Sequence, residues 1–322
     1  MIDAERLLRL RGLPKQKISP KSRLLHHIYT WIRIVGESTY VLHDYSPNDS
    51  FIEAFNHQFR TDHETISQRN RRLDDFLRLQ PRQSDSDLDI DQPKDKDIGL
   101  HDIHLQDSRQ YTDTLYNQIY GIPETWLSLV SQTTRMANVL DCLRIARRTH
   151  SNLSHEAWET VQRRRLRLEN MVCSFDLTRA RGTDSSANDH MLRALNAALV
   201  IFFYRRIRQA HPAVLQGCVD NVISALTEFD QALDQSSHPG PGTAWPAFLA
   251  GCEAITAPRR EAILRWLEKA RAQCGFLAFA RARDVMVEVW KRQDEHIANR
   301  GGDAIPTWVD VVNNWQLWPI FC

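Results

Sequence analysis

Apolar residues recur every three to four positions through most of this chain, and that spacing restricts the fold more than any other feature. The most apolar stretch is Ala187–Gln209, which we expect to form a helix at the centre of the core. No segment shows a convincing strand pattern, and only 12 glycines occur in 322 residues, which disfavours glycine-rich β architectures. The sequence therefore predicts an all-α fold with about eight to ten helices.

The predicted helices are unequal in length, and no fixed period of about 34 to 47 residues marks a helical repeat array. We expect an irregular multi-helix domain, with a degenerate helical solenoid as the structural alternative. Ser154 is suited to cap the helix that follows it. The expected helical stretches are 22–42, 60–79, 107–120, 123–148, 154–172, 187–209, 214–233, 245–255, 258–273, 276–299 and 306–321.

One segment differs in composition from the rest of the chain. Residues 84–97 contain six aspartates in fourteen positions, as a solvated loop or linker does. We therefore expect an N-terminal helical segment at 1–83, an acidic linker at 84–106 and a main helical domain at 107–322. The N-terminal segment is expected to form one domain with the main part.

The charges and the longest apolar stretch limit the partners of the chain. With 41 basic and 40 acidic residues, the net charge of +1 gives no overall field that attracts nucleic acid or a membrane. The stretch 194–204 has eleven residues, fewer than the roughly 20 that a helix needs to cross a bilayer. We expect no membrane partner. The six cysteines include no Cys-x-x-Cys pair, which argues against a zinc or redox pair and fits a reducing compartment.

The aspartate-rich segment suggests a calcium loop only at first sight. Asp85, Asp87 and Asp89 occupy alternate positions, as at the start of an EF-hand loop. The sixth position is Ile90 instead of glycine, and the twelfth is Lys96 instead of a bidentate carboxylate. A solvated acidic loop is the better interpretation.

Other candidate sites are equally weak. The sequence His-Asp-Ile-His at 101–104 lacks the spacing of a metal-binding helix, and Asp74-Asp75 is followed by Arg78 where a terpene cyclase needs a third carboxylate. Nucleophile elbows, phosphate loops and dinucleotide fingerprints are absent from the sequence. We therefore predict no catalytic, cofactor-binding or metal-binding residue and no cofactor.

A possible basic surface for phosphate is formed by the arginines at 144, 147, 148, 163–165, 167, 205, 206 and 208. The stronger interpretation is that their stems cover apolar helix surface. No aromatic residues are interleaved to stack on single-stranded bases.

Several motifs in the C-terminal third resemble a known family. Residues 245–254 read Trp-Pro-Ala-Phe-Leu-Ala-Gly-Cys-Glu-Ala and are followed by Arg259-Arg260 and Trp266-Leu267. Together with Val289–Arg292 and Trp308–Val312, they resemble the fungal-specific transcription factor domain. The stretches 29–40 and 119–127 resemble, more narrowly, fungal regulators of the arginine-metabolism type. The similarity covers nearly the whole chain.

The resemblance implies an all-helical regulatory region of a Zn2Cys6 regulator that acts in the nucleus. Its partners would be transcription machinery or other regulators, and a homodimer and a small effector are left open. In the family a six-cysteine zinc cluster reads DNA, but these cysteines are widely spaced, so we carry over neither zinc nor sequence-specific DNA binding. A fragment, a shortened gene and a relative that has lost the cluster remain open.

Within the resembling block, Trp245, Phe248 and Glu253 are interpreted as structural residues at a helix start rather than ligand contacts. The alternative for the whole chain is a helical metabolic enzyme that acts on a small metabolite through an unrecognised site. Two convergent carboxylates in a deep cavity would favour that alternative.

Overall fold

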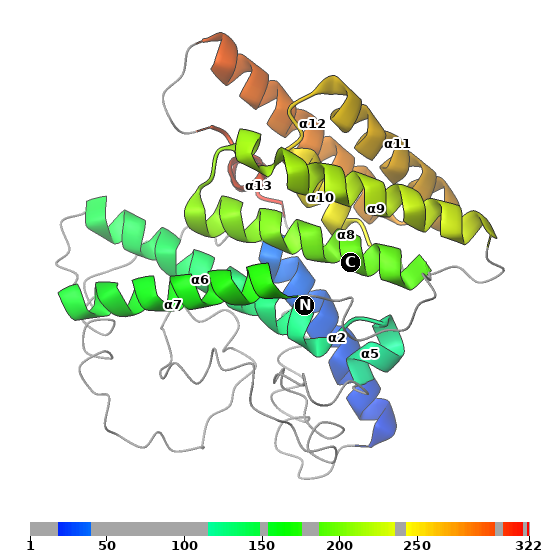
Figure 1. Cartoon of the computed structure of the whole chain (residues 1–322), viewed down its shortest axis with the longest axis horizontal. Coiled ribbons are helices and arrows are strands. Elements are labelled where there is room, and N and C mark those ends of the chain that lie inside the picture. The colour runs from blue at the N-terminus through cyan, green and yellow to red at the C-terminus, as the bar shows by residue number, and fades with distance from the viewer. Residues whose placement is uncertain are drawn as a thin grey trace. The chain divides into compact units, whose positions relative to one another are not determined.

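The computed structural model describes residues 19–39, 115–148, 154–175, 187–235, 243–299, 305–317 and 321. Within these ranges the chain forms ten α-helices, one π-helix and one 3-10 helix, and no strand (Figure 1). The predicted all-α fold is thereby confirmed, and the ten α-helices of the described residues lie within the predicted number. The expected helix at 60–79 and the linker at 84–106 lie outside the described residues, so the predicted domain boundaries stay a prediction.

The chain divides into two compact units, residues 1–37 with 44–174 and residues 38–43 with 175–322. In the first unit, Trp31 stacks on Tyr120 with ring centroids 4.8 Å apart and lies 6.0 Å from Trp126. The N–H of Ala157 donates to Ser154 Oγ at 3.2 Å, which confirms the predicted cap. The helices of this unit are α2 (Pro20–Thr39), whose last two residues belong to the second unit, α5 (Leu115–Tyr120), α6 (Glu124–Arg148) and α7 (His155–Ser174).

The second unit is built around one apolar helix. Nine of the 17 residues of α8 (Ala187–Phe203) are buried, and this helix packs against both α9 and α10. Helix α10 also contacts α11 and α12, which run side by side (Figure 1). The other helices are a π-helix (Tyr204–Arg208), a 3-10 helix (Pro212–Leu215), α9 (Gln216–Gln235), α10 (Trp245–Cys252), α11 (Ala257–Cys274), α12 (Leu277–Ala298) and α13 (Trp308–Trp315).

Two predicted helices differ from the observed ones near their ends. The stretch 187–209 changes from α-helix to π-helix at Tyr204 and ends at Gln209, which has a φ of 52°. The last helix was expected to reach residue 321 but ends at Trp315, because Gln316 adopts the left-handed conformation at a φ of 50°. Left-handed residues commonly end helices, but they are usually glycine.

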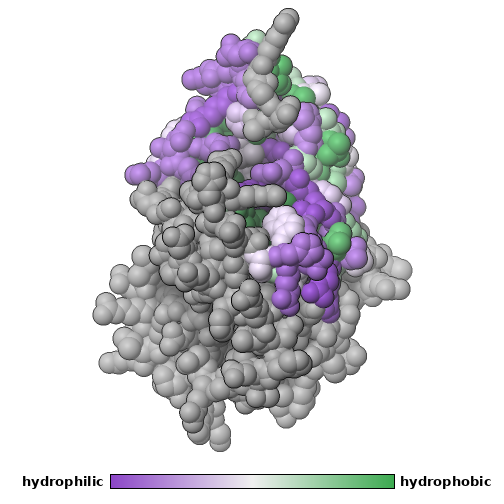
Figure 2. Space-filling model, turned by 90° about the vertical axis from the view of Figure 1, so that its left-hand side faces the viewer, coloured by the Kyte–Doolittle hydropathy of each residue, from purple (hydrophilic) through white to green (hydrophobic). Residues whose placement is uncertain are grey.

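The described surface is largely polar on the side that Figure 2 shows, with a few small hydrophobic areas among hydrophilic residues. Among the described helices, none combines the length and the apolar character that a membrane crossing requires.

Two glycines offer a matched test of the helix packing. A Cβ on Gly251 in α10 would lie 2.4 Å from Met286 Cε and 3.2 Å from Ile263 Cγ2, and both neighbours are buried. We expect Gly251→Ala to lower the free energy of unfolding by about 1–3 kcal/mol through overpacking. Gly217 in α9 has nothing within 4 Å of that position. Gly217→Ala should raise the stability by about 0.5–1 kcal/mol through helix propensity. Urea unfolding of the full chain, followed by tryptophan fluorescence, measures both values, and equal effects of the two substitutions would contradict the packing described here.

Candidate functional site

The candidate site is the end of α10, where the family-like block of the sequence meets four other elements. All eight residues of α10 are buried, and the apolar side chains of this short helix leave it without a solvent-facing side. Trp245 packs edge-on against Phe202 of α8, with ring centroids 5.9 Å apart, and its Nε1 donates to Ser38 Oγ at 2.8 Å. Phe248 packs against Trp308 and Phe321. The block thus lies at the centre of the second unit.

Residues 251–254, which we call the capped turn, present four successive backbone carbonyls that accept hydrogen bonds from side chains of other helices. Trp290 Nε1 of α12 donates to the carbonyl of Gly251 at 2.7 Å, and Gln293 Nε2 of the same helix donates to that of Cys252 at 3.3 Å. Gln216 Nε2 of α9 donates to the carbonyl of Glu253 at 2.8 Å. Arg260 Nε of α11 donates to that of Ala254 at 3.0 Å.

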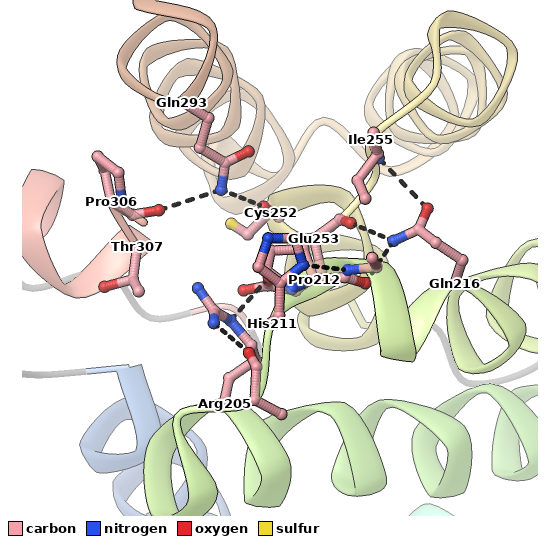
Figure 3. A network of polar contacts seen from close by, with 12 residues as sticks. Arg205, His211, Pro212, Gln216, Cys252, Glu253, Ile255, Gln293, Pro306 and Thr307 are labelled. Atoms are coloured by element: carbon pink, nitrogen blue, oxygen red, sulfur yellow. Dashed lines mark hydrogen bonds and ion pairs between the residues drawn. The ribbon is translucent and has the colours of Figure 1, made fainter. Parts of the chain in front are cut away.

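The capped turn needs these donors because the last carbonyls of a helix have no partner within the helix. A buried carbonyl without a hydrogen bond costs roughly 1–3 kcal/mol. Two donors also serve a second element, since Gln293 donates to the carbonyl of Pro306 at 3.1 Å and Arg260 forms a bidentate pair with Asp294. The Oε1 atom of Gln216 in turn accepts from the N–H of Ile255 (Figure 3). The turn therefore connects α9, α11, α12 and the segment before α13.

A buried ion pair adjoins the capped turn. Arg205 Nε, on the π-helix, lies 2.7 Å from Glu253 Oε2, and the two side chains are 6% and 1% exposed. The Nε–H bond of Arg205 does not point toward Glu253 Oε2. The contact is therefore an ion pair without hydrogen-bond geometry. Arg205 Nη1 donates to the carbonyl of Ala210 at 2.5 Å (Figure 3). Within the described residues, Arg205 Nη2 and Glu253 Oε1 have no hydrogen-bond partner.

Burial raises the pKa of the two titratable groups in this turn. It raises the pKa of the Glu253 carboxyl, against the opposing effect of the Arg205 charge. Burial also raises the pKa of the Cys252 thiol well above its usual value, and the neighbouring Glu253 adds to the shift. A thiol held in its protonated form is a poor nucleophile. The turn is thus suited to hold helices together rather than to catalyse a reaction.

The residues that the sequence singled out lie as follows. Trp245 and Phe248 are fully buried and Glu253 is 1% exposed, and their structural role stays a prediction. Arg205 does not belong to a basic surface, because it is buried beside Glu253. Arg206 lies over the ring of Trp308, 5.7 Å from its centroid. The candidates Asp74-Asp75, Asp85–Asp89 and His101–His104 lie outside the described residues.

Sequence reasoning missed two of the four residues that cap the turn, whereas Arg260 and Trp290 lie within the motifs of the resemblance. Gln216 and Gln293 donate to carbonyls 37 and 41 residues away, and neither side chain belongs to a recognisable motif. Arg205 carried a usable signal, since it directly follows the most apolar helix of the chain, where a charge needs a partner. In the described part of the chain, no group of three or more histidine, cysteine or acidic side chains could hold a metal ion.

The described part of the second unit is an all-α unit held together by the capped turn. The family described as "Fungal specific transcription factor domain" matches residues 1–320, and the chain belongs to this family. This chain is 25% identical over 215 residues to "Arginine metabolism regulation protein II" of Saccharomyces cerevisiae. The alignment covers 62% of this chain and 22% of that protein. The chain therefore spans about a fifth of its curated relative. No solved structure gives a significant match.

These matches confirm the predicted family and its transcription-regulatory function. The family and the relative are transcription regulators and not enzymes. The alternative of a helical metabolic enzyme is therefore not supported.

The buried ion pair can be tested by removing one or both charges. Glu253→Ala leaves the Arg205 cation buried without its counter-charge, so we expect a loss of about 3–5 kcal/mol in the free energy of unfolding. The double variant Arg205→Met/Glu253→Leu removes both charges and should be more stable than Glu253→Ala. Arg259→Met, which breaks the exposed pair with Asp220, is the control and should change the stability little. Urea unfolding of the wild type and the three variants gives the four free energies of unfolding. If the double variant is no more stable than Glu253→Ala, the unpaired Arg205 charge is not the cause of the destabilisation.

The pH dependence gives a second test of the same carboxyl. Because the pKa of Glu253 is raised in the folded chain, its contribution to stability is fully present below its unfolded pKa of about 4.5 and is lost as the pH rises through the folded pKa. Glu253→Gln cannot titrate at this position, so subtracting its stability from that of the wild type isolates the effect of Glu253. We expect the difference, wild type minus variant, to fall as the pH increases from 4 to 8. A rise over the same range would mean that Arg205 dominates and lowers the pKa.

Proposed function

We propose that this chain is the regulatory region of a nuclear transcription regulator of the arginine-metabolism type, and that it acts by binding other regulatory proteins or transcription machinery. The observation that carries the proposal is the family match over residues 1–320, together with the partial similarity to an arginine metabolism regulator. The near-neutral net charge of +1 supports proteins rather than nucleic acid as partners. The nuclear location follows from the same family membership.

The capped turn supports this proposal physically. A domain that binds partners needs a fixed surface, and the turn holds α9, α11 and α12 in one arrangement through side chains from each of these helices. Partner binding costs less conformational entropy when the surface is already ordered. A homodimer and a small effector are further candidates, and we propose neither without a binding measurement.

Tethering the chain to DNA tests the regulatory role directly. The 322-residue chain is fused to a heterologous DNA-binding domain in yeast, and a reporter gene is measured with and without arginine in the medium. We expect the fusion to change reporter output at least several-fold relative to the DNA-binding domain alone, because the chain brings partners to the promoter. Gly251→Ala should weaken the response and Gly217→Ala should preserve it, with protein levels compared by immunoblot. Reporter output equal to that of the DNA-binding domain alone in both media would refute the proposal.

A further inference from the structure

The connection between α11 and α12 exposes large apolar side chains that the fold does not use. Phe276 and Leu277 are 61% and 64% exposed. The two helices already pack through buried side chains such as Trp266 and Phe279, whose rings lie 5.9 Å apart. Gly275 ends α11 at a φ of 72°, and no atom lies within 4 Å of the position that its Cβ would occupy. The connection therefore stands open to solvent with an apolar pair at its tip.

Two arginines lie close in sequence to this apolar pair, one on each helix. Arg271 lies in the last turn of α11, where its carbonyl accepts from the N–H of Gly275, and Arg281 lies one helical turn after Leu277 on the same side of α12. Both arginines are exposed, and within the described part of the chain neither has an ion-pair partner. The first turn of α12 contains no acidic residue. We call Arg271, Phe276, Leu277 and Arg281 the hairpin tip.

The tip differs from the sides of the same helices. There, several basic residues pair with acids of a neighbouring helix: Arg259 pairs with Asp220 and Lys269 with Asp230 and Asp234. Uncompensated charge next to exposed apolar surface is typical of a binding site, because apolar contact supplies affinity and charge selects the partner.

We propose that the hairpin tip docks a short acidic peptide segment with apolar side chains, supplied by another regulatory protein. This inference rests on the proposed function and identifies the kind of partner. The apolar residues of the peptide would cover Phe276 and Leu277, while its carboxylates would meet Arg271 and Arg281. An aliphatic leucine beside a single phenylalanine offers no platform on which successive bases could stack, so the same surface fits a peptide better than a nucleic acid.

The test uses the full chain and a fluorescently labelled synthetic peptide in which aspartate alternates with leucine and isoleucine. Fluorescence anisotropy should show saturable binding that weakens several-fold when salt is raised from about 50 to 200 mM, since the attraction is partly screened. Phe276→Ser/Leu277→Ser and Arg271→Glu/Arg281→Glu should each weaken binding about tenfold or more. Val214→Ser and Lys291→Glu, which alter exposed apolar and basic residues elsewhere in the second unit, are the matched controls and should leave binding unchanged.

Three outcomes would overturn the proposal: no binding of the peptide, equal binding by the tip variants, and binding of a DNA duplex that depends on the same four residues. A peptide with asparagine in place of aspartate separates the charge from the apolar contact and should bind at least tenfold more weakly. The tethered reporter distinguishes the two levels of proposal. If the tip variants retain full reporter output and the peptide fails to bind, the tip is not the partner surface but the regulatory role stands. If the wild-type fusion is inactive as well, the proposed function itself is wrong.

Discussion

The second unit depends on how the buried end of α10 satisfies its backbone carbonyls. An eight-residue helix with no exposed side cannot direct its last carbonyls to water, so protein donors must replace the solvent. Four such donors come from Gln216, Arg260, Trp290 and Gln293, and each is fixed on a different turn of a surrounding helix. The satisfaction of one helix end thereby determines where α9, α11 and α12 can lie, which apolar packing alone would specify less strictly.

The ion pair between Arg205 and Glu253 depends on an unusual local backbone conformation. Arg205 lies in the π-helix that follows α8, and this helix ends at Gln209 in the left-handed conformation, with the N–H of Gln209 and that of Ala210 both directed to the carbonyl of Tyr204. The Arg205 side chain donates a hydrogen bond to the carbonyl of Ala210 and so stabilises the turn that ends the π-helix. A non-glycine residue in the left-handed region costs about 1 kcal/mol or more. π-helical turns are found frequently at functional sites. Here the π-helical turn positions the side chain of Arg205, which is the counter-charge of Glu253.

The sequence predicted the helices well and their polar contacts poorly, for a physical reason. Periodicity reports which face of a helix is apolar, and it located α6, α11 and α12 to within a few residues. It carries no information on a side chain that bonds a backbone carbonyl about 40 residues away, as Gln216 and Gln293 do. The overlong helix at 306–321 has the same origin, because a glutamine at position 316 gives no warning of a left-handed turn. The resemblance in the block 245–254 pointed to the residues of the capped turn. It did not explain why Gly251 and Glu253 occur there.

The structure separates rigidity from recognition within the second unit. At the capped turn four side-chain hydrogen bonds join its carbonyls to other helices, and a Cβ on Gly251 would collide with Met286, so this part tolerates little rearrangement. At the hairpin tip, Phe276 and Leu277 are mostly exposed, and the side chains of Arg271 and Arg281 have no ion-pair partner among the described residues. A regulatory domain benefits from this division, because a partner that binds an ordered but unused surface does not have to displace native interactions. The same α11 and α12 connect the two places, so the residues that cap the turn also fix the orientation in which the tip is presented.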